Sequence, residues 1–358
     1  MTVSTEASGD GQRVPGVPGV EDPLVLAKWM ADAGLTAAGE LRGVHLIAGG
    51  RSNLTYRLDL DGGQIVLRRP PLGHVLPTAH DMSREYRVLS ALSGTAVPVP
   101  RPLAHCQDPD VIGAPFYLME FVDGVVLRTA QDGVGLSPQQ AGELSSLMAE
   151  MLATIHGVDI ESAGLTGFGR PEGYLARQLA RWQRQRELSN TRELPGYAEL
   201  VQRLADRLPD SADGTLVHGD FRLDNTLIQL TSPARVAAVV DWEMSTLGDP
   251  LVDLGLTLSY WADGAEGVPE VTAGASITTL PGFWSRDQFA ARYAALTGRD
   301  VSAIGYYIAF GYFKLAIVLE GIHARFLQHQ TVGEGFEREG PAVPVLIERA
   351  HTMLDTLG

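Results

Sequence analysis

The sequence has a single cysteine, Cys106, among its 358 residues. One thiol cannot form an internal disulfide, so the chain is not a disulfide-rich secreted module, and we expect a cytoplasmic location. No segment approaches roughly eighteen uninterrupted apolar residues, so we expect no membrane-spanning helix. The first residues lack a basic start followed by an apolar run, and we therefore expect no signal peptide.

Positive charge is also scarce. Lys and Arg number 28 against 43 Asp and Glu, which gives a formal net charge of −15. This balance argues against general affinity for nucleic acid or for an anionic membrane, and no obligatory protein partner is evident. An acidic surface would tolerate a cationic substrate. It also simply keeps cytoplasmic enzymes soluble, and we give this second interpretation more weight.

What remains is the composition of a globular enzyme. Hydrophobic residues make up 45% of the chain and charged residues 20%, which is ordinary for a folded domain. The length allows two lobes with a substantial core. Residues 1–20 are rich in Gly, Ser, Thr and Pro, and we predict a flexible tail there.

The segment after this tail is rich in predicted strands. Asp61-Gly62-Gly63 is a strong hairpin signal between strands at 53–60 and 64–69. We place a lobe boundary after Val122, so that residues 21–122 form an N-terminal lobe and residues 123–358 a C-terminal lobe. The other elements predicted in the first lobe are helices at 22–33 and 83–92, strands at 44–47 and 115–122, and an extended segment at 97–102.

The C-terminal lobe is predicted to be mainly helical. Apolar residues recur at helical spacing along most of it. A strand-rich half followed by a helical half is an α+β order and not an alternation of strand and helix. The predicted helices span residues 138–156, 174–188, 197–208, 250–260, 286–296, 303–328 and 341–357.

The strongest functional signal interrupts these helices. Asp220 and Asn225 lie five residues apart, and Asp241 follows the apolar run 236–240. Phosphoryl transfer needs such a set: one carboxylate to take the proton of an attacking hydroxyl, and an amide and a carboxylate to hold magnesium. A strand pair at 226–230 and 235–240 would bring the two pieces together. An isolated Gly-Asp is usually only a turn, but here the other two residues are in register with it.

The pattern His218-Gly219-Asp220, four residues, Asn225, and then Asp241 resembles the aminoglycoside phosphotransferase and choline kinase superfamily. The resemblance covers about residues 40 to 330 and implies a two-lobed protein-kinase-like fold, with ATP or GTP and Mg²⁺ in the cleft. Four further stretches resemble the bacterial branch related to the kinase domains associated with acyl-CoA dehydrogenases. They are Leu67-Arg68-Arg69-Pro70-Pro71, Arg84-Glu85-Tyr86-Arg87-Val88-Leu89, the segment from Gly113 to Glu120, and the segment from Gly248 to Gly255.

The resemblance assigns roles to the three catalytic residues. Asp220 would be the catalytic base, which accepts or orients the proton of the substrate hydroxyl. Asn225 and Asp241 would hold Mg²⁺, which prefers hard oxygen ligands and keeps several waters. His218 is predicted to be structural, with its imidazole bonded to nearby backbone.

Arg68 lies where the family places the cation that contacts the α- and β-phosphates. Many relatives have Lys there, and an Arg supplies the charge with a larger fork. Strand alternation sends Arg68 and Arg69 to opposite faces, so only one can enter the cleft, and we choose Arg68. Glu85 on the next helix would position it, although an ordinary surface pairing of Glu85 with Arg84 or Arg87 is the alternative.

Other nucleotide contacts are predicted in the N-terminal lobe. The loop before residue 54 matches the family loop that covers the phosphates, because glycine lets backbone N–H groups approach an anion. Two glycines at a hairpin are, by themselves, usually only a turn. The segment 119–122 matches the hinge whose backbone reads adenine, and it is also compatible with a buried strand. The predicted contacts are Gly49, Gly50, Ser52, Asn53, Glu120 and Val122.

Three charged residues around the motif are predicted to have structural roles. Asp253 would brace the catalytic loop through backbone N–H groups, and Asp249 would begin a helix ahead of Pro250. Asp224 would be solvated or would brace the loop. Arg222 would meet a phosphate or a substrate carboxylate, and a surface salt bridge is an equal alternative.

The sequence therefore predicts a kinase for a small molecule, which moves the γ-phosphate of ATP or GTP to a hydroxyl. The alternatives are a nucleotide-binding pseudokinase and an effector-binding protein on the same fold. Two acceptor classes stay open: an aminoglycoside, or a hydroxyacyl compound or another metabolite. Six residues were considered for the acceptor site, although aromatic residues on helices are more often core. They are Trp182, Tyr260, Trp261, Tyr306, Tyr307 and Arg325.

Overall fold

The computed structural model describes residues 14–35, 39–47, 53–72, 81–189, 192–210, 214–262, 277–328 and 336–357. The contacts divide the chain into two compact units. Unit 1 comprises Met1–Ser90 and Pro100–Phe121, and unit 2 comprises Ala91–Val99 and Val122–Gly358. The Val239 N–H donates to the Pro98 carbonyl at 2.8 Å, which helps to attach the segment 91–99 to unit 2.

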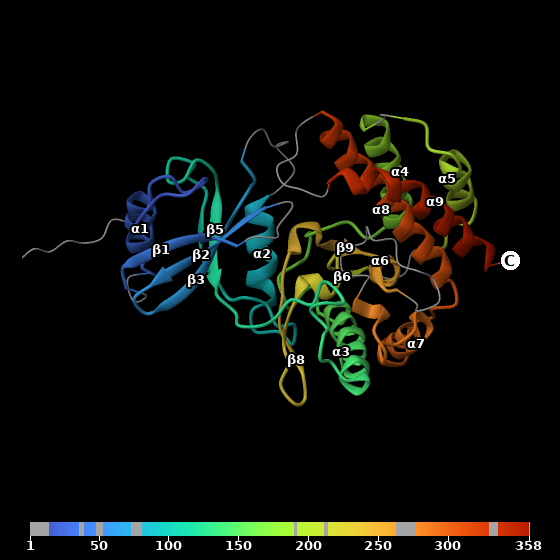
Figure 1. Cartoon of the computed structure of the whole chain (residues 1–358), viewed down its shortest axis with the longest axis horizontal. Helices are drawn as coiled ribbons and strands as arrows, with labels where there is room; N and C mark the ends of the chain where they lie inside the picture. Colours follow the sequence, from blue (N-terminus) through green and yellow to red (C-terminus); the bar gives the residue numbers. More distant parts are fainter. Residues whose placement is uncertain are drawn as a thin grey trace, which may run out of the picture. The chain divides into compact units, whose positions relative to one another are not determined.

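Unit 1 is built on a five-stranded sheet in the order β1-β2-β3-β5-β4 (Figure 1). Every neighbouring pair in it is antiparallel. Two helices accompany the sheet. The strands are β1 (Leu41–Leu46), β2 (Leu54–Leu60), β3 (Gly63–Arg69), β4 (Pro102–Cys106) and β5 (Phe116–Glu120), and the helices are α1 (Pro23–Asp32) and α2 (Met82–Leu92).

The two faces of this sheet carry different side chains. Ile65 and Leu67 of β3 and Phe116 of β5 form a hydrophobic core with apolar residues of α1. Alternation along β3 sends the side chain of Arg68 to the opposite face. There it meets Glu85 of α2. The Arg68–Glu85 pair thus lies on the face away from this core, beside the buried Val66, Tyr117 and Met119.

Two features of unit 1 differ from the predictions. Val20 is fully buried in the core, with Val14 and Val17 packed against it, so the predicted tail does not extend to residue 20. Residues 1–13 lie outside the described residues. The segment predicted as extended at 97–102 is followed by β4, a strand missed because its Pro-Leu-Ala-His-Cys sequence does not alternate. It begins with Pro102, and the first residue of a strand is a position that tolerates proline.

Unit 2 contains every helix predicted for the C-terminal lobe, with ends that differ by a few residues. Two short strand pairs accompany these helices: β7 with β8, which was predicted, and β6 with β9, which was not. The helices are α3 (Pro138–His156), α4 (Tyr174–Leu188), α5 (Tyr197–Asp206), α6 (Pro250–Tyr260), α7 (Arg286–Thr297), α8 (Ile304–Leu327) and α9 (Glu339–Asp355). The strands are β6 (Thr215–Val217), β7 (Thr226–Gln229), β8 (Arg235–Val239) and β9 (Thr246–Gly248).

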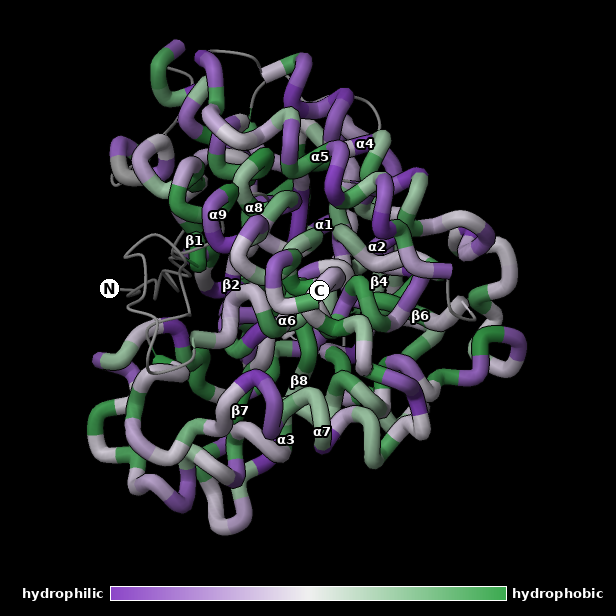
Figure 2. Tube along the Cα trace, turned by 90° about the vertical axis from the view of Figure 1, so that its right-hand side faces the viewer, coloured by the Kyte–Doolittle hydropathy of each residue, from purple (hydrophilic) through white to green (hydrophobic). Residues whose placement is uncertain are grey.

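Helix α8 is the central helix of unit 2, and apolar residues run along most of it (Figure 2). Of the helices in the described residues, it alone is long and apolar enough to span a membrane, but 72% of that stretch is buried inside the protein. Such burial is expected of a core helix. Gly255 of α6 allows close packing against α8, because a Cβ atom there would lie 2.4 Å from the Tyr307 carbonyl oxygen. This packing brings α6 and α8 together beside the catalytic loop.

The hairpin of β7 and β8 was predicted from sequence and is confirmed. Its register pairs Thr226 with Val239. The Val240 N–H also donates to the carbonyl of Asn225 at 2.9 Å. Because Asn225 precedes one strand and Asp241 follows the other, the hairpin places these two residues at the same end.

Candidate active site

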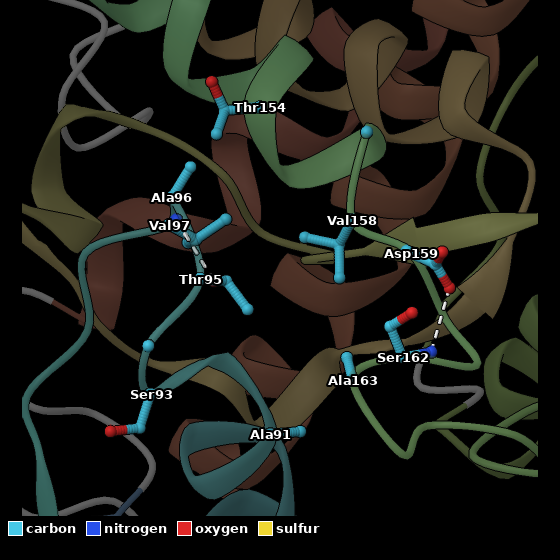
Figure 3. A pocket seen from close by; sticks show the side chains of 12 residues that line it. Ala91, Ser93, Thr95, Ala96, Val97, Thr154, Val158, Asp159, Ser162 and Ala163 are labelled. Carbon is cyan, nitrogen blue, oxygen red and sulfur yellow. Dashed lines mark hydrogen bonds between the residues drawn. The ribbon is translucent and has the colours of Figure 1, made fainter.

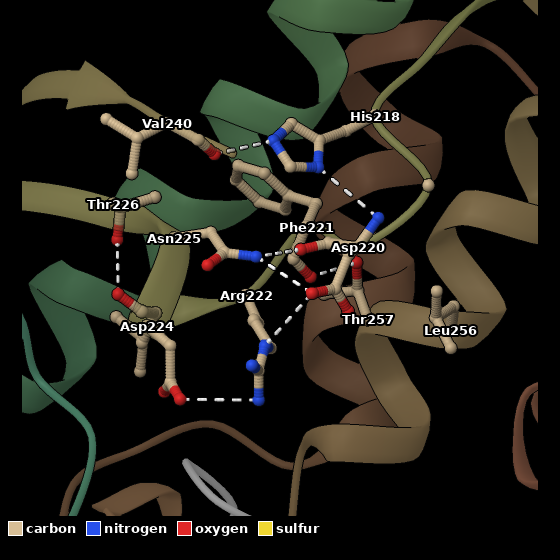
Figure 4. Close-up of polar contacts among 12 residues, drawn as sticks. His218, Asp220, Phe221, Arg222, Asp224, Asn225, Thr226, Val240, Leu256 and Thr257 are labelled. Atoms are coloured by element: carbon tan, nitrogen blue, oxygen red, sulfur yellow. Dashed lines mark hydrogen bonds and ion pairs between the residues drawn. The ribbon is translucent and has the colours of Figure 1, made fainter. Parts of the chain in front are cut away.

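His218 begins the loop that carries Asp220, and its imidazole is bonded on both sides (Figure 4). The Asp220 N–H donates to Nδ1 at 3.3 Å, which leaves the ring proton on Nε2. That Nε2 lies 3.0 Å from the carbonyl oxygen of Val240 and donates to it. The ring is fully buried, 4.6 Å from the ring of Trp242. Both ring nitrogens are hydrogen-bonded to backbone groups, which agrees with the structural role predicted for His218.

Asp253 of α6 holds the loop from beneath. Its Oδ2 accepts from the His218 N–H at 2.7 Å and its Oδ1 from the Gly219 N–H at 2.8 Å. The Nε2 of His156 lies 3.2 Å from the same carboxylate. Burial would raise the pKa of Asp253, but hydrogen bonds from His156 and the His218 N–H outweigh it and lower the pKa. The predicted brace is therefore an ionised, buried carboxylate.

Asp220 and Asn225 are joined directly. The Nδ2 of Asn225 donates to the Asp220 carbonyl at 2.8 Å and to its Oδ2 at 2.9 Å. These two bonds fix the orientation of the amide, because only the nitrogen can donate. The Oδ1 of Asn225 consequently points away from Asp220 and remains available as an acceptor.

Asp241 occupies an unusual backbone conformation. With φ of 68° and ψ of 56°, it is the one non-glycine residue with positive φ in the part of the chain described. An Asp tolerates this left-handed region better than most residues, but it still carries strain. Strand β8 ends just before it, and a turn of 3-10 helix, Trp242–Met244, begins just after it. The backbone thus turns sharply at the residue predicted to hold metal.

Arg222 contacts two carboxylates of the loop and the ring of Tyr260 at the end of α6. Its Nε lies 3.4 Å from Asp220 and its Nη1 3.3 Å from Asp224. Its guanidinium carbon stands 4.8 Å from the ring centre of Tyr260. Burial opposes the charge, but the carboxylates outweigh it and raise the pKa of Arg222. Burial, followed by the charge of Asp220, raises the pKa of the Tyr260 phenol, so this group stays neutral. Arg222 and Asp224 therefore brace the loop.

Arg68, the cation predicted to contact the nucleotide phosphates, lies in unit 1. The Nε of Arg68 lies 3.0 Å from Oε2 of Glu85, and the exposed side-chain fractions are 11% and 2%. The pair predicted from sequence is thus formed. Arg69 points to the other face, where its Nη1 donates to the carbonyls of Gly19 at 2.5 Å and Ile112 at 2.8 Å.

The remaining predicted nucleotide contacts are distributed unevenly. Gly49, Gly50 and Ser52 lie outside the described residues. Asn53 is 3% exposed and directly precedes β2. The two predicted hinge residues lie in different units. Glu120 ends β5, where its N–H donates to the Arg101 carbonyl at 2.9 Å, and Val122 begins the second segment of unit 2.

Lys314 was missed by the sequence analysis. Its Nζ donates to the carbonyl of Gly219 at 2.7 Å and lies 5.6 Å from the ring centre of Trp182. The signal was present in the sequence, because Lys314 is an isolated charge in the apolar run from Tyr306 to Leu319. Only the tertiary contact of α8 with the loop gives that charge a meaning.

Most residues considered for the acceptor site prove to be core. Trp261, Tyr306 and Tyr307 are at most 3% exposed. Their polar atoms donate to Trp284 O, Leu204 O and Asp249 Oδ2 respectively. Arg325 is exposed near the end of α8. Trp182 and Tyr260 differ, since each lies against a cation beside the catalytic loop.

The donor set fits magnesium. Asn225 offers an amide oxygen that its hydrogen bonds leave outward, and Asp241 offers a carboxylate. These are two hard oxygen ligands, and a nucleotide-bound magnesium takes its other ligands from phosphate and water. Consistent with so few protein ligands, no group of three His, Cys, Asp or Glu that could hold a metal occurs in the described residues.

A pocket of about 600 Å³ lies elsewhere in unit 2 (Figure 3). It is formed by residues 91–97 and by residues at and after the end of α3. Its one charged lining residue is Asp159, and that carboxylate accepts from the Ser162 N–H at 2.9 Å. None of the predicted site residues lines it, and it offers no group suited to phosphoryl transfer.

The sequence is similar to that of a known family of enzymes. Residues 43–294 match the model of the phosphotransferase enzyme family, APH. The chain belongs to this family. It is 36% identical over 303 residues to acyl-CoA dehydrogenase family member 10 of Mus musculus, covering 84% of this chain but 28% of that protein. The chain thus spans less than a third of the length of this relative.

Solved structures show the same fold. A putative aminoglycoside phosphotransferase from Ralstonia eutropha JMP134 is 34% identical, with a TM-score of 0.78 over 94% of this chain and 98% of that one. The GDP and kanamycin complex of APH(2″)-IIIa is 15% identical, with a TM-score of 0.61 over 90% of this chain and 99% of that one. The predicted kinase-like α+β fold is confirmed.

Proposed function

We propose that the chain is a small-molecule kinase that transfers the γ-phosphate of ATP or GTP to a hydroxyl group. The observation that carries the proposal is the Asn225 amide. Its nitrogen is bonded to the catalytic-base candidate Asp220, which leaves its oxygen for the proposed role of metal ligand. The hairpin that places Asp241 at the same end supports this assignment.

In the proposed reaction the acceptor hydroxyl attacks the γ-phosphorus in line. A bond forms between the acceptor oxygen and phosphorus, and the bond to the bridging oxygen breaks, which releases the nucleoside diphosphate. The hydroxyl proton passes to a carboxylate oxygen of Asp220. Asn225 and Asp241 would hold Mg²⁺, which neutralises phosphate charge. Asp253 and Arg222 keep the loop in place while the proton moves.

Unit 1 contributes a cation to this proposal. Arg68 would contact phosphate oxygens of the nucleotide, with Glu85 limiting its side-chain freedom. An arginine can grip two oxygens at once, which suits a phosphate group. The loop residues Gly49, Gly50, Ser52 and Asn53 and the hinge residues Glu120 and Val122 remain proposed contacts, on the strength of the family resemblance.

The first test is nucleotide consumption with magnesium across aminoglycosides, hydroxy acids, hydroxyacyl thioesters and amino alcohols. Asp220→Ala should lower turnover by about 10³-fold, because general-base catalysis is lost. It should leave nucleotide binding intact, whereas Asp241→Ala should weaken binding of the magnesium nucleotide. Full turnover by Asp220→Ala would contradict the assigned base.

Nucleotide binding without consumption would favour a different function. A pseudokinase or an effector-binding protein on this fold would bind nucleotide or ligand but would transfer no phosphate to any acceptor in the panel. The retained Asp220, Asn225 and Asp241 argue against this alternative, since such proteins commonly lose the base or a metal ligand.

A further inference from the structure

Lysine is rare in this chain, and one of the two lysines lies at the catalytic loop. Lys28 is exposed on α1, and Lys314 is partly buried on α8. Nearly all other basic side chains are arginine. The ammonium at position 314 is therefore not one of many interchangeable surface charges.

The ammonium of Lys314 has more donors than partners. Of its three N–H bonds, one reaches the Gly219 carbonyl at 2.7 Å. Its other contact in the described residues is the face of Trp182, 5.6 Å away. On α8 it is flanked by the buried Phe313 and Leu315, whereas Lys314 itself stays partly exposed. Donor capacity thus remains on a side chain that is only partly buried.

A second cation lies on the same tryptophan. The guanidinium carbon of Arg181 stands 5.5 Å from the Trp182 ring centre. Arg181 is exposed on α4 and makes no ion pair with a described carboxylate within 4.0 Å. Its charge lowers the pKa of Lys314 further, after burial, which is the larger cause. Two like charges near one ring repel each other, and a bound anion would offset this repulsion.

The nearby carboxylates attract Lys314 but do not bond to it directly. Asp253 also faces Lys314, but its oxygens already accept from His218, Gly219 and His156. Asp220 attracts Lys314 electrostatically, yet its carboxylate accepts from Asn225 and pairs with Arg222. Neither forms an ion pair with Lys314 within 4.0 Å. Lys314 therefore lies near two carboxylates without a direct ion pair to either in the described residues, and its remaining N–H groups are left for another acceptor.

We propose that Lys314, with Arg181, forms a cationic subsite that binds an anionic oxygen group of the hydroxyl acceptor beside Asp220. The inference rests on the proposed kinase function and names the acceptor class: a hydroxylated carboxylate or phosphate ester. A polycationic acceptor such as an aminoglycoside would meet two like charges there. The net charge of −15 is that of the whole chain. The choice between an anionic and a cationic acceptor would depend instead on these two cations at the site.

The test compares matched charged and uncharged acceptors. Hydroxy carboxylates of three to about six carbons, each with its methyl ester, hydroxyalkyl phosphates, and kanamycin are assayed with magnesium ATP. The wild-type chain should prefer an acid over its ester by about ten- to a hundredfold in kcat/KM, as expected of one charge-assisted hydrogen bond. Carboxylates and phosphates distinguish the two sources of the anion, and kanamycin should be a poor acceptor.

Variants test whether Lys314 causes the preference for the acid over its ester. Lys314→Met keeps most of the length of the side chain and removes its charge, so it should erase the preference for acid over ester. Because the Gly219 carbonyl also loses its donor, kcat should fall for acid and ester alike, and the ratio of their kcat/KM values is the readout. Lys314→Arg should keep most of the preference, and Arg181→Met should lose part of it. Lys28→Met is the matched control, because it removes the other lysine, and it should change nothing. Thermal unfolding and nucleotide binding report whether each variant is folded.

A second readout does not need turnover. Calorimetry measures binding of the carboxylates and their esters to the protein saturated with magnesium AMP-PNP, in the wild type and in Lys314→Met. Tighter binding of a carboxylate that depends on Lys314, without phosphate transfer to any compound, would support the subsite and reject the kinase. Equal use of acid and ester by the wild type, or carboxylate binding unaffected by Lys314→Met, would overturn the subsite and leave the kinase standing.

Discussion

Arg68 in unit 1 and Asp220 in unit 2 are both charged side chains assigned to phosphoryl transfer, but they are held by different kinds of contact. Arg68 is fixed by its strand and by Glu85, only 17 positions away. The loop of Asp220 is fixed by Asp253 and by Lys314, which is 95 positions from its partner Gly219. A local contact depends on one strand and the helix that follows it. A long-range contact couples the reaction to the stability of the unit.

The largest effect should follow from Asp253→Asn. The amide can accept from only one of the two loop N–H groups, and its NH₂ would oppose the other donor. Breaking this buried, charged contact should cost about 3 kcal/mol of unfolding free energy. Turnover should fall as well, because His218 and Gly219 position Asp220. Urea unfolding and nucleotide consumption measure the two losses, and a loss of activity at unchanged stability would argue against the coupling.

The pH dependence of the unfolding free energy tests the same contact of Asp253 with the loop. The pKa of Asp253 is lowered in the folded protein from its ordinary value of 3.8. The ionised form therefore stabilises the fold fully above about pH 4, and this stabilisation is lost as the pH falls through the lower folded value. Unfolding free energy measured from pH 6 downward should decline more steeply for the wild type than for Asp253→Asn. If the unfolding free energies of the two proteins fell in parallel with pH, Asp253 would not contribute to the loss of stability in acid.

A smaller effect separates the two neighbouring arginines of unit 1. Arg69→Met should lose about 2 kcal/mol of stability, because the carbonyls of Gly19 and Ile112 lose a charged, buried donor. Arg68→Met should instead weaken nucleotide binding about tenfold. It should also lower stability, because the buried Glu85 carboxylate loses its charged partner. Arg68→Lys, as the charge-preserving control, should recover most of the binding. The reverse pattern would mean that the wrong arginine was chosen.

The choice between those arginines was predictable from the sequence because a strand has a period of two. Similarly, the pairing of Asn225 with Asp241 followed from one short hairpin, and the brace at Asp253 from a family pattern. The helical half was predictable from apolar spacing. In each case the decisive contact is local or lies within a recognised motif.

The rest depended on tertiary structure. Lys314 was visible in the sequence only as a charge within an apolar helix, and nothing local indicates that α8 passes the Gly219 carbonyl. The packing of Gly255 against Tyr307 decides that approach. Strand β4 was missed for a related reason: its pairing with β5, and not its own pattern, makes it a strand.

The smallest effect tests how much Arg68 depends on its local partner. Glu85→Gln keeps a side chain of the same size that can still accept one hydrogen bond, but it removes the charge facing Arg68. Because the Gln amide oxygen can still accept from Arg68 and Arg68 keeps some access to solvent, stability should fall by only about 1 kcal/mol although the pair is largely buried. The nucleotide KM should rise about two- to threefold, since Arg68 loses some orientation. If Glu85→Gln lowered stability as much as Asp253→Asn, the two units would not differ in how they hold their charged groups.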